Sequence, residues 1–193
     1  MKGRQAVLEV ILRQVEEVVG ASGSGLRELR TLARETADAV EAISPGIERH
    51  TAAVCPGCQQ VCCANRHCYH EYADIVYLCS LGERPPAYRE GAVDTDPCQF
   101  LGEKGCLLRR SRRPHRCNWF FCTPLLEHVL ESSARDYRVL IAALGEINGK
   151  RRALLHAFGA AMRARGRDPG DLQRFSDEIF FRYEKGRDKF DIL

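Results

Sequence analysis

Long apolar runs are missing from this sequence. No stretch approaches the roughly 18 residues that a membrane-spanning helix needs. The apolar segment near the N-terminus is broken by charged residues, unlike the core of a secretion signal. Net charge is also small, at +3, and by itself gives no reason to expect nucleic acid as a partner. We therefore expect a cytoplasmic protein without a membrane segment, in a compartment where thiols stay reduced.

Cysteine is absent from both flanks of the chain, although the protein contains ten cysteines, all between residues 55 and 122. Such a density has three physical explanations: a disulfide framework, a metal site or redox catalysis. A reducing cytosol disfavours disulfides. A thioredoxin-like redox motif needs its CxxC directly after a buried strand, at the start of a helix. Here only the short segment 51–54 precedes Cys55, and two more cysteines follow closely. Metal binding is therefore the favoured interpretation.

The first part of the cysteine region has the form of a metal-binding knuckle. Cys55-Pro-Gly-Cys58 has the composition of a type II turn, which would bring both sulfurs to one side. Cys62 and Cys63 are adjacent in sequence, so their side chains point in different directions. Both can ligate metal only if two metals, or two edges of one cluster, lie close by.

The second part of the region is a quartet with the spacing Cys98-x7-Cys106-x10-Cys117-x4-Cys122, and Gly105 indicates a tight turn beside Cys106. Thiolates in this number are ligands for zinc or for iron, the latter including a 4Fe-4S cluster. The predicted ligands are eight cysteines: Cys55, Cys58, Cys62, Cys63, Cys98, Cys106, Cys117 and Cys122. Three nearby histidines are alternative ligands or ordinary core-edge residues: His67, His70 and His115.

The densest positive run of the protein, residues 109–116, lies just before Cys117. It is open to three interpretations: a nucleic-acid patch with the aromatic residues that follow it, a solvated surface, or support for an anionic metal–thiolate group. Four thiolates on a divalent zinc leave about two negative charges to be stabilised. We predict that Arg113 contributes to binding the metal or cluster in this way, and we do not expect nucleic acid as a partner.

The remaining sequence predicts a mainly α protein. Apolar residues recur at three- and four-residue spacing in the flanks, and Ser44-Pro45-Gly46 and Leu81-Gly82 are stop signals. Helices are expected at 3–20, 26–43, 69–81, 124–130, 150–165 and 168–183, with a loop at 83–97. Residues 137–147 fit a helix or a strand, and a helix is favoured. The expected organisation is an N-terminal helical hairpin (1–48), an irregular cysteine-rich metal-binding centre (49–123) and a C-terminal helical region (124–193), together forming one compact unit.

The order of these motifs resembles that of the YkgJ-type cysteine-cluster proteins, described as having a zinc- or iron-chelating CxxCxxCC domain. The matching elements are the CxxC with its following cysteine pair, Asp74-Ile75 with Leu81-Gly82, Cys98-Gln-Phe-Leu, and Arg113-Pro114-His-Arg-Cys117. They span roughly residues 55–122. The chain departs from the family by placing three residues between Cys58 and the cysteine pair instead of two. Cys68 and Cys79 are also extra.

The resemblance implies metal chelation and no particular reaction. We expect a protein that binds zinc or iron through cysteine thiolates, with a protein partner or a second copy of the chain docking on the helical flanks. The alternative is a redox or methyl-transferring enzyme component that uses an iron–sulfur cluster. Flagellin lysine N-methylases carry a similar cysteine cluster, but this chain has no glycine-rich nucleotide-binding signature.

Overall fold

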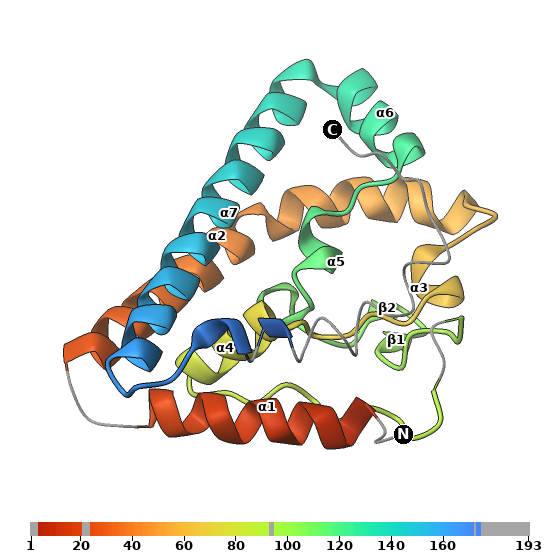
Figure 1. Cartoon of the computed structure of the whole chain (residues 1–193). Helices are drawn as coiled ribbons and strands as arrows, with labels where there is room; N and C mark the ends of the chain where they lie inside the picture. The colour runs from red at the N-terminus through yellow and green to blue at the C-terminus, as the bar shows by residue number, and fades with distance from the viewer. Residues whose placement is uncertain (1–3, 21–23, 93–94, 172, 175–193) are drawn as a thin grey trace.

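The structure is a computed structural model, and it describes residues 4–20, 24–92, 95–171 and 173–174. The chain is mainly helical, as the sequence predicts (Figure 1). The α-helices are α1 (Arg4–Val19), α2 (Ser24–Val54), α3 (Cys62–Asn65), α4 (Tyr72–Ser80), α5 (Arg116–Trp119), α6 (Thr123–Ser132) and α7 (Ala134–Arg163). Short 3-10 helices are η1 (Cys55–Gly57) and η2 (Arg110–Arg112), and strands β1 (Leu101–Gly102) and β2 (Gly105–Cys106) form a small antiparallel hairpin.

The main apolar core joins α1, α4 and parts of α2 and α7. Helix α1 contributes a continuous buried stripe at helical spacing, Val7, Leu8, Ile11, Leu12 and Val15. It faces the almost wholly buried helix α4, whose buried residues include Ile75 and Val76. The region between residues 55 and 122 is therefore not uniformly loop-like, because α4 belongs to the central core.

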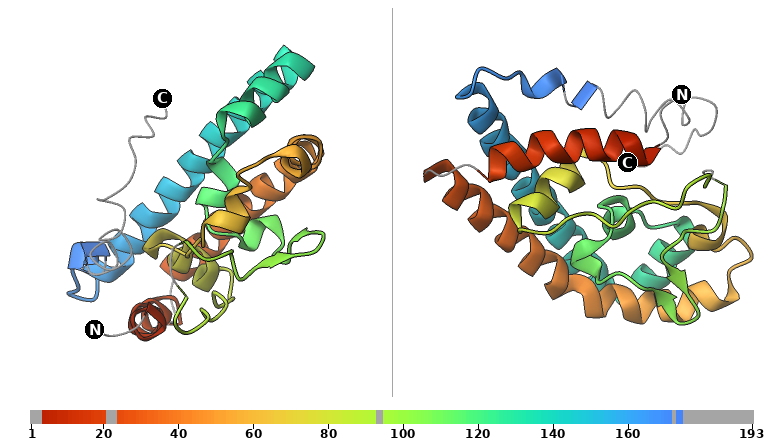
Figure 2. Two further views of the ribbon diagram at one scale, coloured as in Figure 1. Left: turned by 90° about the vertical axis from the view of Figure 1, so that its right-hand side faces the viewer. Right: turned by 90° about the horizontal axis from the view of Figure 1, so that it is seen from below.

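The long helices α2 and α7 lie side by side over part of their length and then diverge, as Figures 1 and 2 show. Helix α6 packs against both of them near the far end of α2. There a second apolar cluster forms, with Ile47, Phe121, Leu125 and Val129 buried. Helix α5 is drawn below α2 in Figure 1, on the side toward α4. The second cluster fixes the position at which the chain passes from the last cysteine, Cys122, into α6.

Two predictions about the N-terminal helices are wrong. Helices α1 and α2 do not pack as an antiparallel hairpin, because α1 packs mainly on α4 whereas α2 packs along α7. Helix α2 also does not end at Pro45 but continues to Val54, so the expected boundary at residue 48 falls inside it. A proline inside a helix costs about 3 kcal/mol, and the packing of α2 against α6, α7 and η2 offsets that loss.

The C-terminal predictions are met in part. Helix α6 begins at Thr123 with Pro124 in its first turn, as expected, so the boundary drawn at residue 123 falls at its start. The two helices expected at 137–147 and 150–165 are one continuous helix, α7. Most of the helix expected at 168–183 lies outside the described residues. None of the helices in the described part of the chain combines the length and the hydropathy that crossing a bilayer requires.

Helix α4 begins and ends with the local signals that the sequence carries. At its start, the Asp74 side chain accepts the backbone N–H of Glu71 at 3.0 Å, one half of a capping box. At its end, Gly82 has φ +82°, and the N–H of Glu83 donates to the carbonyl of Leu78 at 2.9 Å. This is the Schellman arrangement. The expected stop at Leu81-Gly82 is confirmed.

Candidate metal centre

One group of thiols gathers at the end of α2 and consists of Cys55, Cys58, Cys62 and Cys122 (the first thiol group). Burial raises the pKa of the Cys55 thiol, and the neighbouring thiols of the other three raise it further. Burial, then Cys122 and Cys58, raise the pKa of Cys62 in the same way. Thiols that raise one another's pKa lie within electrostatic range, because each disfavours a second thiolate beside it.

Local structure explains how the first thiol group forms. The last turn of α2 passes directly into η1, where the N–H of Cys58 donates to the carbonyl of Cys55 at 3.2 Å. The expected type II turn is therefore wrong, since the segment is a turn of 3-10 helix and Gly57 has no positive φ. Cys122 comes from the start of α6 and packs on the second apolar cluster, which also contacts Val54. That cluster brings the last cysteine of the sequence beside the first.

The second thiol group consists of Cys63, Cys98, Cys106 and Cys117. Burial, followed by Cys117, Cys98 and Cys106 in that order, raises the pKa of Cys63 to about 11. Burial also raises the pKa of Cys106, and Cys117 and Cys98 add to the effect. The four thiols therefore lie within electrostatic range of one another. Cys63 lies on α3, Cys106 on β2 and Cys117 on α5.

Backbone hydrogen bonds hold the second thiol group in place. The N–H of Cys98 donates to the carbonyl of Cys63 at 2.8 Å, which joins two segments far apart in sequence. The β-hairpin then turns the chain back, pairing Leu101 with Cys106. Gly105 has φ +109°, so the tight turn expected at this position is confirmed.

The cysteine pair is the point at which the two thiol groups meet. Cys62 and Cys63 open helix α3, where consecutive side chains diverge around the helix axis. Cys62 belongs to the first thiol group and Cys63 to the second. Sequence order suggests two other quartets, 55–63 and 98–122. In the fold, Cys63 instead lies with the later cysteines Cys98, Cys106 and Cys117, and Cys122 lies with the earlier cysteines.

The two extra cysteines differ from each other in their surroundings. The thiols of Cys68 and Cys117 shift each other's pKa, upward for Cys68 and downward for Cys117, so Cys68 lies near the second thiol group. Cys79 is buried in the main apolar core on α4, and its pKa is raised to about 12, mainly by burial and further by Glu16. The sequence contains no signal that separates these two residues, since only the tertiary packing places Cys68 beside Cys117.

Two arginines of the basic run lie beside the second thiol group. Arg110 and Arg113 have side chains only 4% and 15% exposed, and both reach the Glu48 carboxylate, at 3.8 and 3.7 Å. The guanidinium of Arg113 opposes the burial that raises the pKa of Cys106. Both guanidiniums also help to lower the pKa of Cys117, although the neighbouring Cys68 thiol is the main cause. Because α2 continues past Pro45, it carries Glu48 to these arginines.

Two other arginines of the run, Arg109 and Arg112, are more exposed and pair with carboxylates. Arg112 lies 2.7 Å from Glu83, and Arg109 lies 3.7 Å from Glu41. These two arginines form surface ion pairs, whereas Arg110 and Arg113 are largely buried near the thiols.

The three histidines considered as ligands have protein partners in the structure. The Nε2 atom of His67 lies 3.2 Å from the side-chain oxygen of Gln99. His70 is fully buried and donates from Nε2 to the carbonyl of Arg112 at 3.0 Å. His115 lies 2.8 Å from the side-chain oxygen of Asn148. Because these histidines contact other protein groups, the cysteine thiols remain the better candidates for metal ligands.

Sulfur is a suitable donor atom for zinc or iron, but the cysteine side chains do not converge on one point in the structure. Across residues 4–20, 24–92, 95–171 and 173–174, no three His, Cys, Asp or Glu side chains converge closely enough to hold a metal ion. Each thiol group still supplies the four sulfurs that a structural zinc or an iron–sulfur cluster uses. Cys62 and Cys63 are exposed and the other six are partly exposed, so a metal ion can reach them.

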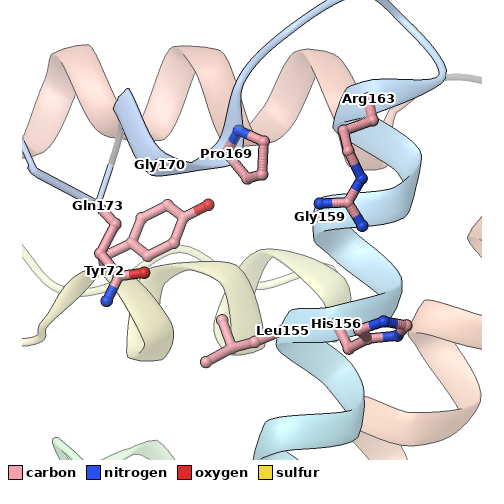
Figure 3. Close-up of a pocket in the computed structure, with 8 residues that line it drawn as sticks. All are labelled: Tyr72, Leu155, His156, Gly159, Arg163, Pro169, Gly170 and Gln173. Atoms are coloured by element: carbon pink, nitrogen blue, oxygen red, sulfur yellow. The ribbon is translucent and has the colours of Figure 1, made fainter.

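A cavity of about 260 Å³ lies elsewhere, between α4 and the end of α7 (Figure 3). Tyr72, His156 and Arg163 are among the residues that line it, and no cysteine does. This cavity is therefore separate from the thiol groups.

Comparison of the chain with family models, with curated proteins and with solved structures found no match. The resemblance to the YkgJ-type proteins therefore rests on the cysteine pattern itself.

Proposed function

We propose that this protein is a metal-binding protein with two adjacent thiolate centres, one on each thiol group. The observation that carries the proposal is the division of Cys62 and Cys63 between two sets of four thiols. Two adjacent residues cannot easily serve one tetrahedral ion, but they can each complete a different site. The metal is zinc or iron, and an iron centre can be a 4Fe-4S cluster.

The electrostatics support bound cations. Neighbouring thiols raise the pKa values of Cys55, Cys62 and Cys63, in addition to the effect of burial. A divalent cation removes that mutual repulsion, because it stabilises each thiolate that it binds. At the second thiol group, Arg110 and Arg113 supply positive charge from a largely buried position. Such groups offset the surplus negative charge of a four-thiolate centre.

The proposal is tested by comparing single substitutions at adjacent residues. The protein is purified anaerobically, and zinc, iron and acid-labile sulfide are measured per chain. We expect Cys62→Ser and Cys63→Ser each to lose about half of the bound metal, since each removes one of four ligands from a different centre. Cys79→Ser is the matched control, because this thiol lies in the apolar core, and it retains the full metal content.

Two results would contradict the two-centre arrangement. Complete metal loss in both single variants would mean one shared centre, and full metal content in both would mean that these thiols are not ligands. The absorption spectrum then decides the kind of metal. Zinc is colourless and redox-silent, whereas an iron–sulfur cluster absorbs visible light and bleaches on reduction. A cluster that cycles between two oxidation states would favour the redox or methyl-transferring alternative.

A partner or a second copy of the chain on the helical flanks is also part of the proposal. Three apolar side chains stand exposed on α6 and α7, namely Leu130, Val139 and Ile141. They provide apolar area that a protein partner can cover. Light scattering of the metal-loaded protein measures whether the chain self-associates. A cytoplasmic location and the absence of a nucleic-acid partner remain predictions.

A further inference from the structure

The cavity between α4 and the end of α7 has the features of a small-ligand site that is separate from the thiol groups. Its volume of about 260 Å³ lies just below the range of about 300–1,000 Å³ that is usual for pockets of drug-sized ligands. The lining includes apolar side chains from Leu155 and Pro169, the Tyr72 phenol and the Arg163 guanidinium. A cavity of this size and lining suits a compact ligand with both an apolar part and a polar group.

Tyr72 brings to the cavity a hydroxyl that lacks a strong hydrogen-bond partner. The residue is only 6% exposed, and its ring packs edge-on against Phe158, with 6.2 Å between the ring centroids. In the part of the chain that the structure describes, the one hydrogen bond of this hydroxyl is donated to the Met162 sulfur at 3.9 Å. A thioether sulfur is a weak acceptor. A ligand oxygen in the cavity would therefore give the hydroxyl a better acceptor.

Arg163 supplies positive charge to the cavity. It is an exposed residue of α7, so a ligand can reach its guanidinium from solvent. Figure 3 shows this guanidinium on the side of the cavity toward which the Tyr72 hydroxyl points. Among the described residues, no carboxylate forms an ion pair with Arg163, and the nearest acidic residues in sequence, Asp168 and Asp171, pair with Arg174 at 3.5 and 2.5 Å. The guanidinium is thus available to a ligand anion.

Gly159 keeps the space beside this guanidinium open. Any side chain at this position would place its Cβ atom 3.4 Å from Nη1 of Arg163 and 3.6 Å from Cγ of Pro169. A glycine inside a helix is less favourable than an alanine, so the missing methyl group is a cost to α7. That cost leaves room between the arginine and the proline, where a ligand can lie.

We propose that this cavity binds a small carboxylic acid with a compact apolar body, in its ionised form. The carboxylate accepts hydrogen bonds from the Arg163 guanidinium and the Tyr72 hydroxyl, because a planar guanidinium matches the two oxygens of a carboxylate. The apolar body lies against Leu155 and Pro169, which an anion such as phosphate would leave uncovered. The assignment does not depend on the proposed metal function, because no cysteine lines the cavity.

The experiment titrates the whole protein, as purified under reducing conditions, with benzoate as the probe. Two-dimensional NMR of ¹⁵N-labelled protein follows the amide signals, and we expect benzoate to shift those of Gly159 and Gly170, which line the cavity. Benzamide has the same shape without the charge, and it should bind about tenfold more weakly or less, because hydrogen bonds to a charged group are the stronger kind. Inorganic phosphate tests the apolar part and should leave these signals unchanged at the same concentration.

Two pairs of variants test the polar contacts. Arg163→Gln and Tyr72→Phe should each raise the dissociation constant of benzoate about tenfold or more, because each removes a donor to the carboxylate. Arg165→Gln is the control for the arginine, since its side chain donates to the carbonyl of Ala161 at 2.7 Å. Tyr77→Phe is the control for the phenol, because Tyr77 is a buried tyrosine of the same helix α4. Neither control residue lines the cavity, and both variants should bind benzoate as the parent does.

Gly159→Ala tests the cavity with both donors still in place. Its methyl group narrows the space beside Arg163, so benzoate binding should weaken about fivefold or more. The proposal is overturned if about 10 mM benzoate leaves the signals of Gly159 and Gly170 in place. Equal affinity for benzoate and benzamide, or for benzoate and phosphate, also overturns it. So does an unchanged dissociation constant in Arg163→Gln and Tyr72→Phe, once circular dichroism has shown that both variants are folded.

Discussion

The buried ion pair between α4 and α7 gives the sharpest prediction about stability. Arg151 of α7 lies 2.8 Å from Oδ1 of Asp74, and the two side chains are only 10% and 3% exposed. The same carboxylate accepts the N–H of Glu71 at 3.0 Å and the N–H of His115 at 3.2 Å. Asp74 thus joins the main core to the segment that leads to Cys117. We predict that Arg151→Ala strongly destabilises the protein.

The magnitude follows from what the substitution leaves behind. Removing one partner of a buried ion pair costs about 3–5 kcal/mol, because the other charge remains buried without compensation. Lys150, the neighbour of Arg151 in the sequence, forms ion pairs with Glu35 at 3.3 Å and with Glu146 at 3.6 Å. The side chains of these two glutamates are 49% and 65% exposed. Such exposed pairs contribute about 0–1 kcal/mol. Lys150→Ala is therefore a control at the adjacent position on the same helix.

Urea unfolding followed by far-UV circular dichroism measures both variants, with metal-loaded protein under reducing conditions. We expect Arg151→Ala to lose about 3–5 kcal/mol of a total near 5–15 kcal/mol, with an unchanged denaturant slope. At about 2–4 °C per kcal/mol, the melting temperature falls by about 6–20 °C. The double variant Asp74→Asn/Arg151→Met removes both charges and keeps an acceptor for one of the two N–H groups, so we expect it to lose less than Arg151→Ala. A loss for Arg151→Ala within about 1 kcal/mol of that for Lys150→Ala would refute the reasoning.

Two further predictions concern charge near the thiols and pH. Arg113→Ala is expected to weaken zinc retention by about 10–100-fold in a chelator competition. Arg109→Ala is the control and should have little effect, because the Arg109 side chain is 71% exposed. Salt-sensitive oligonucleotide binding by the parent, together with full zinc retention in Arg113→Ala, would instead favour a nucleic-acid patch. Burial lowers the pKa of His70 below its ordinary 6.5. As pH falls, this histidine is therefore protonated in the unfolded chain before it is protonated in the folded protein. Its contribution to stability is present above about pH 6.5 and declines below it, by up to about 1.4 kcal/mol per pH unit. The free energy of unfolding measured between about pH 7 and 5 should depend less on pH in His70→Gln, and an unchanged slope would be evidence against this.

Local chemistry made several elements predictable. The apolar periodicity of α1, the stop of α4 at Leu81-Gly82 and the proline at the start of α6 each depend on residues a few positions apart. The same local rules failed at Pro45. A proline usually ends a helix, but here tertiary packing of α2 against its neighbours outweighs the lost hydrogen bond. The strength of that packing is not visible in the residues around the proline.

The pairing of the thiols depends on contacts that no sequence spacing reveals. Cys122 reaches the first thiol group because Phe121 and Leu125 are buried against Ile47 of α2. Cys63 reaches the second because its carbonyl accepts the N–H of Cys98. Both contacts join segments separated by more than thirty residues. The sequence therefore indicates which cysteines are candidates for metal binding, but only the fold assigns each to a group.

The two thiol groups are anchored to different parts of the structure, and this separation has a consequence for the protein's behaviour. The first group depends on the small apolar cluster around Ile47, whereas the second depends on the β-hairpin and the arginines beside Glu48. Different contacts hold the two groups, so we expect that one centre can lose its metal while the second keeps it. The shortest covalent connection between them is the peptide bond of Cys62 and Cys63, at the start of the four-residue helix α3. A change at one centre therefore reaches the other most directly through α3, which makes this short helix the element to follow when one metal is removed.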